Sequence, residues 1–213
     1  MRKGIRAKLT IKNGRNMITI INVYAPHSEL TKQKPQDTEK FYDTLDNLIK
    51  KLQNESSITI VAGDLNASVG KRIDEHLNCI GNYSKGECNT NGEHLIELCE
   101  THNLILTNTC FPHKQSHSTT WQQTRINKNT GKIEHVRKVI DFIAIEDQYK
   151  HLLTNARTYQ GTTTDSDHRM LITTLNVDWH QAHKYKDTKS RDKTHEFNTH
   201  MLVQDTEVKQ QYQ

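Results

Sequence analysis

Polar side chains end or interrupt apolar runs at four separate places in this 213-residue chain. They are Tyr24, the pair Asp64 and Asn66, Asp141, and the run Ser166, Asp167 and His168. Burying such groups beside strands is costly unless they have partners, so their placement favours a functional role. Carboxylates, an amide, an imidazole and a phenol are an inventory for phosphate chemistry. They offer oxygen ligands for Mg²⁺, a base for water, and donors to a phosphoryl oxygen.

Each of these groups also has a purely structural interpretation. Asp64 and Asn66 could form an Asx turn that ends a strand, and Asp141 could lie exposed on an edge strand. Asp167 and His168 could cap a turn, and a lone histidine is more often structural than catalytic. The occurrence of all four groups in this order, on alternating strands and helices, favours the catalytic interpretation.

The elements that must position these groups follow from the apolar pattern. Strands are predicted at residues 16–24, 57–62, 104–108, 139–145 and 170–177, and helices at residues 36–52 and 91–99. Alternating strands and helices predict an α/β fold. Tyr24 and Asp64 fall at the ends of their strands, where α/β sheets usually place ligand groups.

Composition and charge set limits on the class of protein. Hydrophobic residues make up 33% of the chain and the formal net charge is +4, which predicts a thin core and permits a polyanionic partner. No apolar run approaches the roughly 18 residues of a membrane span, so no membrane partner is expected. Four cysteines without a C-x-x-C pair lack standard zinc spacing, which favours reduced thiols and an intracellular location. Residues 1–179 are predicted to form one domain, and the polar residues 180–213 a linker or tail.

Five blocks, taken in order, resemble the signature blocks of the endonuclease/exonuclease/phosphatase superfamily. They are NVYAP at 22–26, GDLN at 63–66, Thr120 with Trp121, IDFI at 140–143, and SDH at 166–168. The similarity covers about residues 5–179. Within the superfamily, it is greatest to the abasic-type endonuclease domain of non-LTR (LINE, RTE-like) retrotransposons and their craniofacial-development-protein-like relatives.

The resemblance implies a four-layered α/β sandwich, in which two mostly antiparallel sheets pack face to face with helices outside. It also implies a metal-dependent hydrolase that nicks DNA, with Mg²⁺ as the cofactor or Mn²⁺ in its place. The expected partners are DNA and a reverse-transcriptase domain in a longer ancestral protein. With these partners we expect a nuclear location. The resemblance gives no expectation for the oligomeric state.

The same resemblance implies a role for each matching residue. Asp64 would orient and deprotonate the attacking water, and Asn66 would hold that water and the phosphate. His168 would donate to a non-bridging phosphate oxygen, while Asp141 fixes its tautomer. Tyr24 would contact the phosphate. We expect these groups and Asp167 to meet in one cleft, with Asp141 and His168 roughly 2.6–3.2 Å apart.

The remaining roles concern metal and nucleic acid. Asp167, together with Asp64, is expected to hold the metal. Thr120 is expected to contact the phosphate beside Trp121, and both residues, with Asn66, are expected to bind nucleic acid.

The sequence departs from the family in two ways. His27 stands where retrotransposon members often have asparagine. The family's front third, which carries a metal-binding glutamate, has no counterpart here, so we expect an N-terminally truncated fold with an open sheet edge and little or no activity. Glu29 or Glu39 could take over the ligand role. Two alternatives stay open: a non-catalytic, domesticated binding module of the same fold, and a superfamily phosphatase or phosphodiesterase acting on another substrate.

Overall fold

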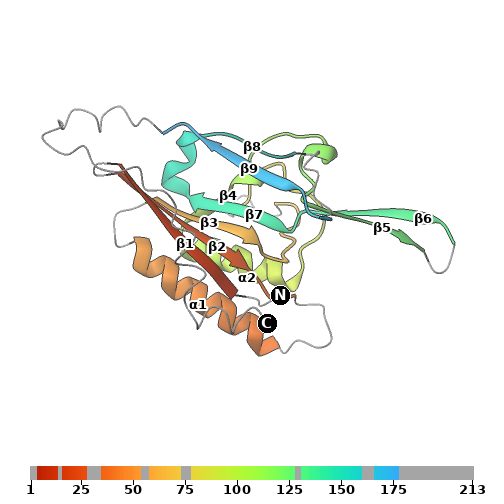
Figure 1. Cartoon of the computed structure of the whole chain (residues 1–213), viewed down its shortest axis with the longest axis horizontal. Helices are drawn as coiled ribbons and strands as arrows, with labels where there is room; N and C mark the ends of the chain where they lie inside the picture. The colour runs from red at the N-terminus through yellow and green to blue at the C-terminus, as the bar shows by residue number, and fades with distance from the viewer. Residues whose placement is uncertain are drawn as a thin grey trace, which may run out of the picture. The chain divides into compact units, whose positions relative to one another are not determined.

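The computed structural model describes residues 4–13, 16–27, 35–53, 58–72, 78–127, 131–159 and 166–177. A five-stranded sheet occupies the centre of this part of the chain, with the strand order β1-β2-β3-β7-β4 (Figure 1). These strands are β1 (Gly4–Asn13), β2 (Asn16–Tyr24), β3 (Ile58–Asp64), β7 (Asp141–Glu146) and β4 (Leu104–Leu106). β2 and β3 are parallel, whereas the other neighbouring pairs are antiparallel.

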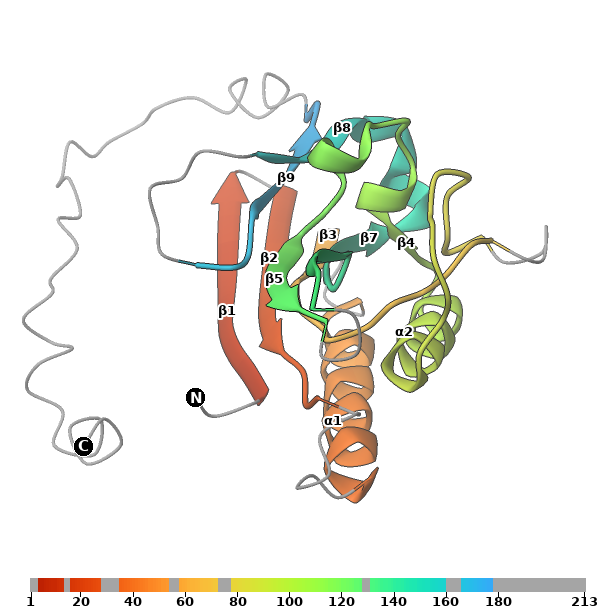
Figure 2. The same ribbon diagram turned by 90° about the vertical axis from the view of Figure 1, so that its right-hand side faces the viewer.

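Two helices, α1 (Pro35–Gln53) and α2 (Thr90–Thr101), pack on one face of this sheet (Figure 2). The buried residues of α1 include Leu45, Ile49 and Leu52, which recur at helical spacing and so lie on one stripe. They meet sheet residues such as Val61, whose neighbours along the strand point the other way. This core fixes the helices over the sheet.

A second, smaller sheet packs on the opposite face. It pairs β8 (Leu153–Tyr159) with β9 (Met170–Leu175) in antiparallel fashion. The isoleucines that contribute one side chain from each of four central strands form the core between the two sheets: Ile18, Ile60, Ile105 and Ile145. Short 3-10 helices connect these parts: η1 (Thr107–Thr109), η2 (Gln115–His117) and η3 (Asp147–Leu152). Just before β9, His168 contacts Asp141 at the end of the central sheet.

A β-hairpin extends away from both sheets in Figure 1. It pairs β5 (Trp121–Ile126) with β6 (Ile133–Lys138), and most of its side chains are exposed. At its base, Trp121 pairs with Lys138 close to the start of β7. The base of the hairpin therefore borders the edge of the sheet where the polar groups were predicted.

The α/β class and the two mostly antiparallel facing sheets are confirmed, and the described residues supply three of the four predicted layers. All five predicted strands and both helices are present, with ends that differ from the prediction by at most two residues. β1, β5, β6 and β8 were not predicted. The four cysteines are present as free thiols. Among the described helices, none is long and apolar enough to cross a membrane. The predicted tail and Glu29 lie outside the described residues.

Replacing Gly63 by alanine is expected to destabilise the domain by about 2 kcal/mol or more. Gly63 has a φ of +147°, and an added Cβ would lie 2.0 Å from the carbonyl oxygen of Val23 in the neighbouring strand. Neither strand can move away without breaking the pairing that holds Asp64. Chemical denaturation of the variant and of Gly86→Ala would test this, because a Cβ at Gly86 meets nothing within 4 Å although its φ is +89°. An equal loss in both variants would mean that only the positive φ matters.

Candidate active site

Three predicted site residues form a row across the end of the central sheet. Tyr24 pairs with Asp64 in the register of β2 and β3, and Asp64 pairs with Asp141 in the register of β3 and β7. Because β2 and β3 are parallel and β7 is antiparallel to β3, the end of two strands meets the beginning of a third. The sheet itself therefore brings the phenol and both carboxylates together.

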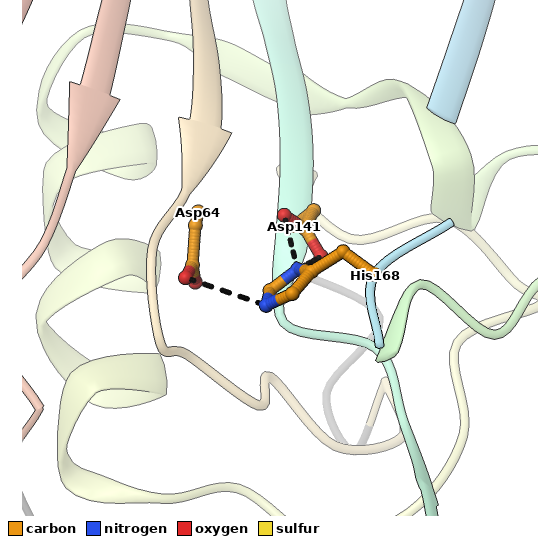
Figure 3. A group of neighbouring side chains, drawn as sticks. All are labelled: Asp64, Asp141 and His168. Carbon is orange, nitrogen blue, oxygen red and sulfur yellow. Dashed lines mark hydrogen bonds and ion pairs between the residues drawn. The ribbon is translucent and has the colours of Figure 1, made fainter. Parts of the chain in front are cut away.

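His168 joins this row from the segment that leads into β9. Its Nδ1 lies 3.1 Å from Asp141 Oδ2 and 3.2 Å from Asp141 Oδ1, while its Nε2 lies 4.0 Å from Asp64 Oδ2 (Figure 3). The predicted pairing of Asp141 with His168 is therefore present. The gap between His168 and Asp64 is too wide for a hydrogen bond. Both side chains can instead contact a third group that is bound between them.

Burial and hydrogen bonding shift the pKa values of Asp64 and His168. Burial raises the pKa of Asp64 to about 6, although the backbone N–H of Asn66 acts in the opposite direction. The hydrogen bond with Asp141 is the main cause that raises the pKa of His168 above its ordinary value. Asp64 is thus a stronger base than an ordinary aspartate, and His168 holds its proton more firmly than an exposed histidine.

Asn66 stabilises the loop that presents Asp64. Its backbone N–H donates to Asp64 Oδ1 at 2.9 Å, which is the Asx-type contact that the structural interpretation anticipated. Its side-chain amide donates to the carbonyl oxygen of Ala25 at 3.0 Å, and its φ of +46° places it in the left-handed region. The Asx turn and the catalytic placement are therefore compatible in one loop.

Asn89, which was not predicted as a site residue, holds the backbone of Asn66 in place. Its Oδ1 accepts from the backbone N–H of Ser68 at 2.8 Å and of Gly92 at 2.8 Å, and so caps α2. Its Nδ2 donates to the carbonyl oxygen of Asn66 at 3.2 Å. One side chain therefore joins the beginning of α2 to the catalytic loop.

Asn91 makes a second such connection from inside the core. This fully buried side chain donates to the carbonyl oxygens of Pro26 at 2.7 Å and Leu65 at 3.1 Å. It therefore joins the loop after β2 to the loop after β3. The Asn-Thr-Asn-Gly helix start was the sequence signal that could have identified both asparagines.

The position of Thr120 does not agree with its predicted phosphate contact. Its side chain is fully buried, and its hydroxyl accepts from the backbone N–H groups of Ile140 at 2.9 Å and Asp141 at 3.1 Å. A direct phosphate contact is incompatible with this placement, because the oxygen faces the protein. Thr120 instead holds the beginning of β7, and with it the backbone of Asp141.

Most of the predicted residues line one cleft. Its volume is 490 Å³, and Tyr24, Asp64, Asn66, Trp121 and His168 all border it, as does His27. Glu87 and Lys138 also line it and were not predicted. Glu39, considered as a replacement ligand, borders a separate groove between α1 and α2.

Ligand atoms of Asp64, Asp141 and His168 all lie within 4.8 Å of one another. Two carboxylates beside an imidazole form a donor set that suits a divalent cation, so the described residues fit the metal that the fold family implies. Asp167, predicted as a ligand, is not a member of this group. Its Oδ2 accepts a hydrogen bond from the Trp121 indole at 2.6 Å instead.

Comparisons with known proteins point to one family. Residues 18–172 match the family described as endonuclease-reverse transcriptase. The chain is 29% identical over 155 residues to craniofacial development protein 2 of Bos taurus, a match that covers 73% of this chain and 24% of that protein. For the protein of the same name from Tragulus javanicus, the identity is 27% over 155 residues, covering 73% of this chain and 25% of that protein. The chain thus spans about a quarter of these relatives.

Solved structures show the same fold at low identity. The endonuclease domain of TRAS1, a telomere-specific non-LTR retrotransposon, aligns with a TM-score of 0.53 and 15% identity, covering 80% of this chain and 63% of that one. The 3'-5' exonuclease NExo from Neisseria meningitidis aligns with a TM-score of 0.54 and 17% identity, covering 75% of this chain and 62% of that one. Both alignments concern the fold alone.

Proposed function

Because the chain belongs to the endonuclease-reverse transcriptase family, within the endonuclease/exonuclease/phosphatase superfamily, we propose that it is a metal-dependent DNA endonuclease that nicks one strand. Phosphodiester hydrolysis in general is the chemistry of this superfamily fold. One observation supports the proposal above all others: Asp141, His168 and Asp64 form a chain of interactions, and His168 and Asp64 line an open cleft.

The proposed reaction forms a bond from a water oxygen to phosphorus and breaks the bond from phosphorus to one ester oxygen, which leaves with the bonding electrons and takes a proton from solvent. Asp64 accepts the proton of the water, and its raised pKa makes it fit for that role. His168 Nε2 donates to a non-bridging phosphate oxygen and stabilises the charge that develops there. Asp141 holds the proton on Nδ1, so that the imidazole keeps one orientation.

A divalent cation would be held by the carboxylates of Asp64 and Asp141. When bound, it supplies charge neutralisation at the phosphate and at the leaving oxygen. The positions of Tyr24 and Asn66 on the cleft wall support their proposed phosphate and water contacts. Lys138 on the same wall adds a positive charge for a polyanionic strand.

DNA is the proposed substrate, with the endonuclease domain of TRAS1 among the structures of similar fold. A nuclear location and a reverse-transcriptase domain in a longer protein are part of the same proposal. Incubating the chain in the presence of Mn²⁺ with supercoiled plasmid, a 3'-phosphorylated hairpin and an inositol polyphosphate would test it. We expect nicked circles and little release of phosphate from the other two substrates. Phosphate release without nicking would favour the phosphatase alternative, and no reaction with any substrate would favour the binding module.

Weak affinity for Mg²⁺ is a consequence of the donor set. Both oxygens of Asp141 lie close to His168 Nδ1, and Asp167 accepts from Trp121. Asp64 accepts from Asn66 through Oδ1, so its Oδ2 is the carboxylate oxygen of this group that can best bind a cation. We therefore expect the chain to nick barely or not at all at about 1 mM Mg²⁺, and to recover in part at higher concentration or with Mn²⁺. Nicking rates over a titration of each metal would measure this. A full rate at about 1 mM Mg²⁺ would mean that another carboxylate of the cleft, such as Glu87, completes the site.

The nicking rate is expected to depend on pH in a bell-shaped manner. Asp64 acts as a base only when it is deprotonated, so the rate should rise as the pH passes about 6. His168 acts as a donor only when it is protonated, so the rate should fall above its raised pKa. Single-turnover nicking in a buffer series of constant ionic strength would measure both limbs. A rate that keeps rising with pH would remove the donor role from His168.

A further inference from the structure

The segment that carries His168 is paired with the base of the hairpin. Trp121 and His168 form an isolated antiparallel bridge. The backbone N–H of Gln122 donates to the carbonyl oxygen of Asp167 at 2.9 Å, and the N–H of Arg169 donates to the carbonyl oxygen of Thr120 at 2.7 Å. His168 is therefore placed by the same strand that begins with Trp121.

Side chains reinforce this pairing on both sides of His168. On one side, the guanidinium of Arg169 donates to the carbonyl oxygen of Ser116 at 2.8 Å and to the side-chain oxygen of Gln122. On the other side, the indole N–H of Trp121 donates to Asp167 Oδ2 at 2.6 Å. Hydrogen bonds to a charged acceptor are short and about twice as strong as neutral ones. This contact is well suited to fix the orientation of the turn.

From these contacts we infer that Trp121 is a positioning residue, which acts through Asp167 to hold His168 against Asp141. This inference rests on the proposed function, since it concerns the same reaction. It assigns the indole N–H to the protein's own turn, rather than to nucleic acid. It also assigns the Asp167 carboxylate to an N–H partner, rather than to a metal ion.

This positioning role differs from two simpler roles, which are stacking of Trp121 on a base and binding of a metal ion by Asp167. If Trp121 only stacked on a base, its ring would matter and its N–H would not. If Asp167 were a metal ligand, its charge would matter, yet it lies outside the group formed by Asp64, Asp141 and His168. The inferred role depends instead on one donor and one acceptor.

Single-turnover nicking by three single variants and one double variant would test the inference. Trp121→Phe keeps the ring and loses the N–H, and Asp167→Ala loses the acceptor. Each is expected to lower the maximal rate about tenfold with little change in the half-saturating DNA concentration, as losses of groups that orient other catalytic residues do. The double variant should be no slower than either single variant. Asp167→Asn keeps an acceptor oxygen and should recover most of the rate that Asp167→Ala loses.

Opposite results would overturn the inference. A raised half-saturating DNA concentration with an unchanged maximal rate in Trp121→Phe would indicate a DNA contact. No effect of Trp121→Phe would leave the N–H without a role. A loss in Asp167→Asn as large as that in Asp167→Ala, cured by added metal, would indicate a metal ligand.

The metal-free chain provides a readout that does not depend on activity. The chain has two tryptophans, so its ¹H NMR spectrum contains two indole N–H resonances. The resonance that Trp121→Phe removes is that of Trp121. We expect Asp167→Ala, but not Asp167→Asn, to shift this resonance, and both Trp121→Phe and Asp167→Ala to shift the ring signals of His168 at constant pH. Gln123→Ala, an exposed position on β5, is the matched control and should leave these signals unchanged. Unshifted His168 signals in both variants would refute the inference, whereas shifted signals in a chain that never nicks would reject only the proposed function.

Discussion

Replacing Asp141 by asparagine is expected to lower the nicking rate about 10³–10⁴-fold while the domain stays folded. Asp141 accepts from His168 Nδ1 at 3.1 Å, and this hydrogen bond is the main cause of the raised pKa of His168. An asparagine carries no negative charge, so the pKa of His168 should fall, less of the imidazolium that donates from Nε2 should be present, and the ring should lose the charged acceptor that orients it. Catalytic groups that act as a unit lose most of their effect when one fails.

The control for this experiment is Asp43→Asn, which removes the same charge from an exposed position on α1. Its rate should equal that of the unchanged chain. Melting temperatures of both variants show whether the fold is retained. An Asp141→Asn rate within a factor of about three of the control would mean that His168 does not depend on Asp141 for its orientation.

Replacing Asp64 by asparagine is expected to lower the nicking rate about 10²–10⁴-fold, because the variant has no base for the water. The stability should change in the opposite direction. Burial raises the pKa of Asp64 from the ordinary 3.8 to about 6, so the folded state loses stability as the pH rises through this interval. A neutral amide avoids that loss and still offers an oxygen to the backbone N–H of Asn66.

Denaturation at pH 7.5 and single-turnover nicking, measured on the same preparation of Asp64→Asn, would test both parts. We expect a chain that is at least as stable as the original and far slower. A variant that is both less stable and only slightly slower would identify Asp64 as a structural residue of the turn.

The sequence predicted the elements whose patterns are set by burial. Residues 16–24 are rich in β-branched side chains and lie in the sheet, so tertiary packing and local preference agree there. The same agreement explains why Asp64 and Asp141 were found, since each is a polar residue in or at the end of an apolar strand. Their exact pairing across β3 and β7 required the sheet register, which a single sequence does not contain.

The missed elements have physical reasons of their own. β5 and β6 form an exposed hairpin, so no alternation of apolar and polar residues marks them. β1 does alternate, with Ile5, Ala7, Leu9 and Ile11 at every second position, and this signal was overlooked. Thr120 was misassigned because a motif gives the type of a side chain but not its direction, which here is inward.

The most direct test of the central claim compares the unchanged chain with His168→Ala in one assay of supercoiled plasmid nicking with Mn²⁺. We expect metal-dependent conversion to nicked circles by the unchanged chain and a rate about 10²–10⁴-fold lower for His168→Ala. Chelation with EDTA should abolish the reaction. Equal rates for the two proteins, or nicking that survives chelation, would contradict the claim that Asp64, Asp141 and His168 hydrolyse phosphodiester bonds in this cleft.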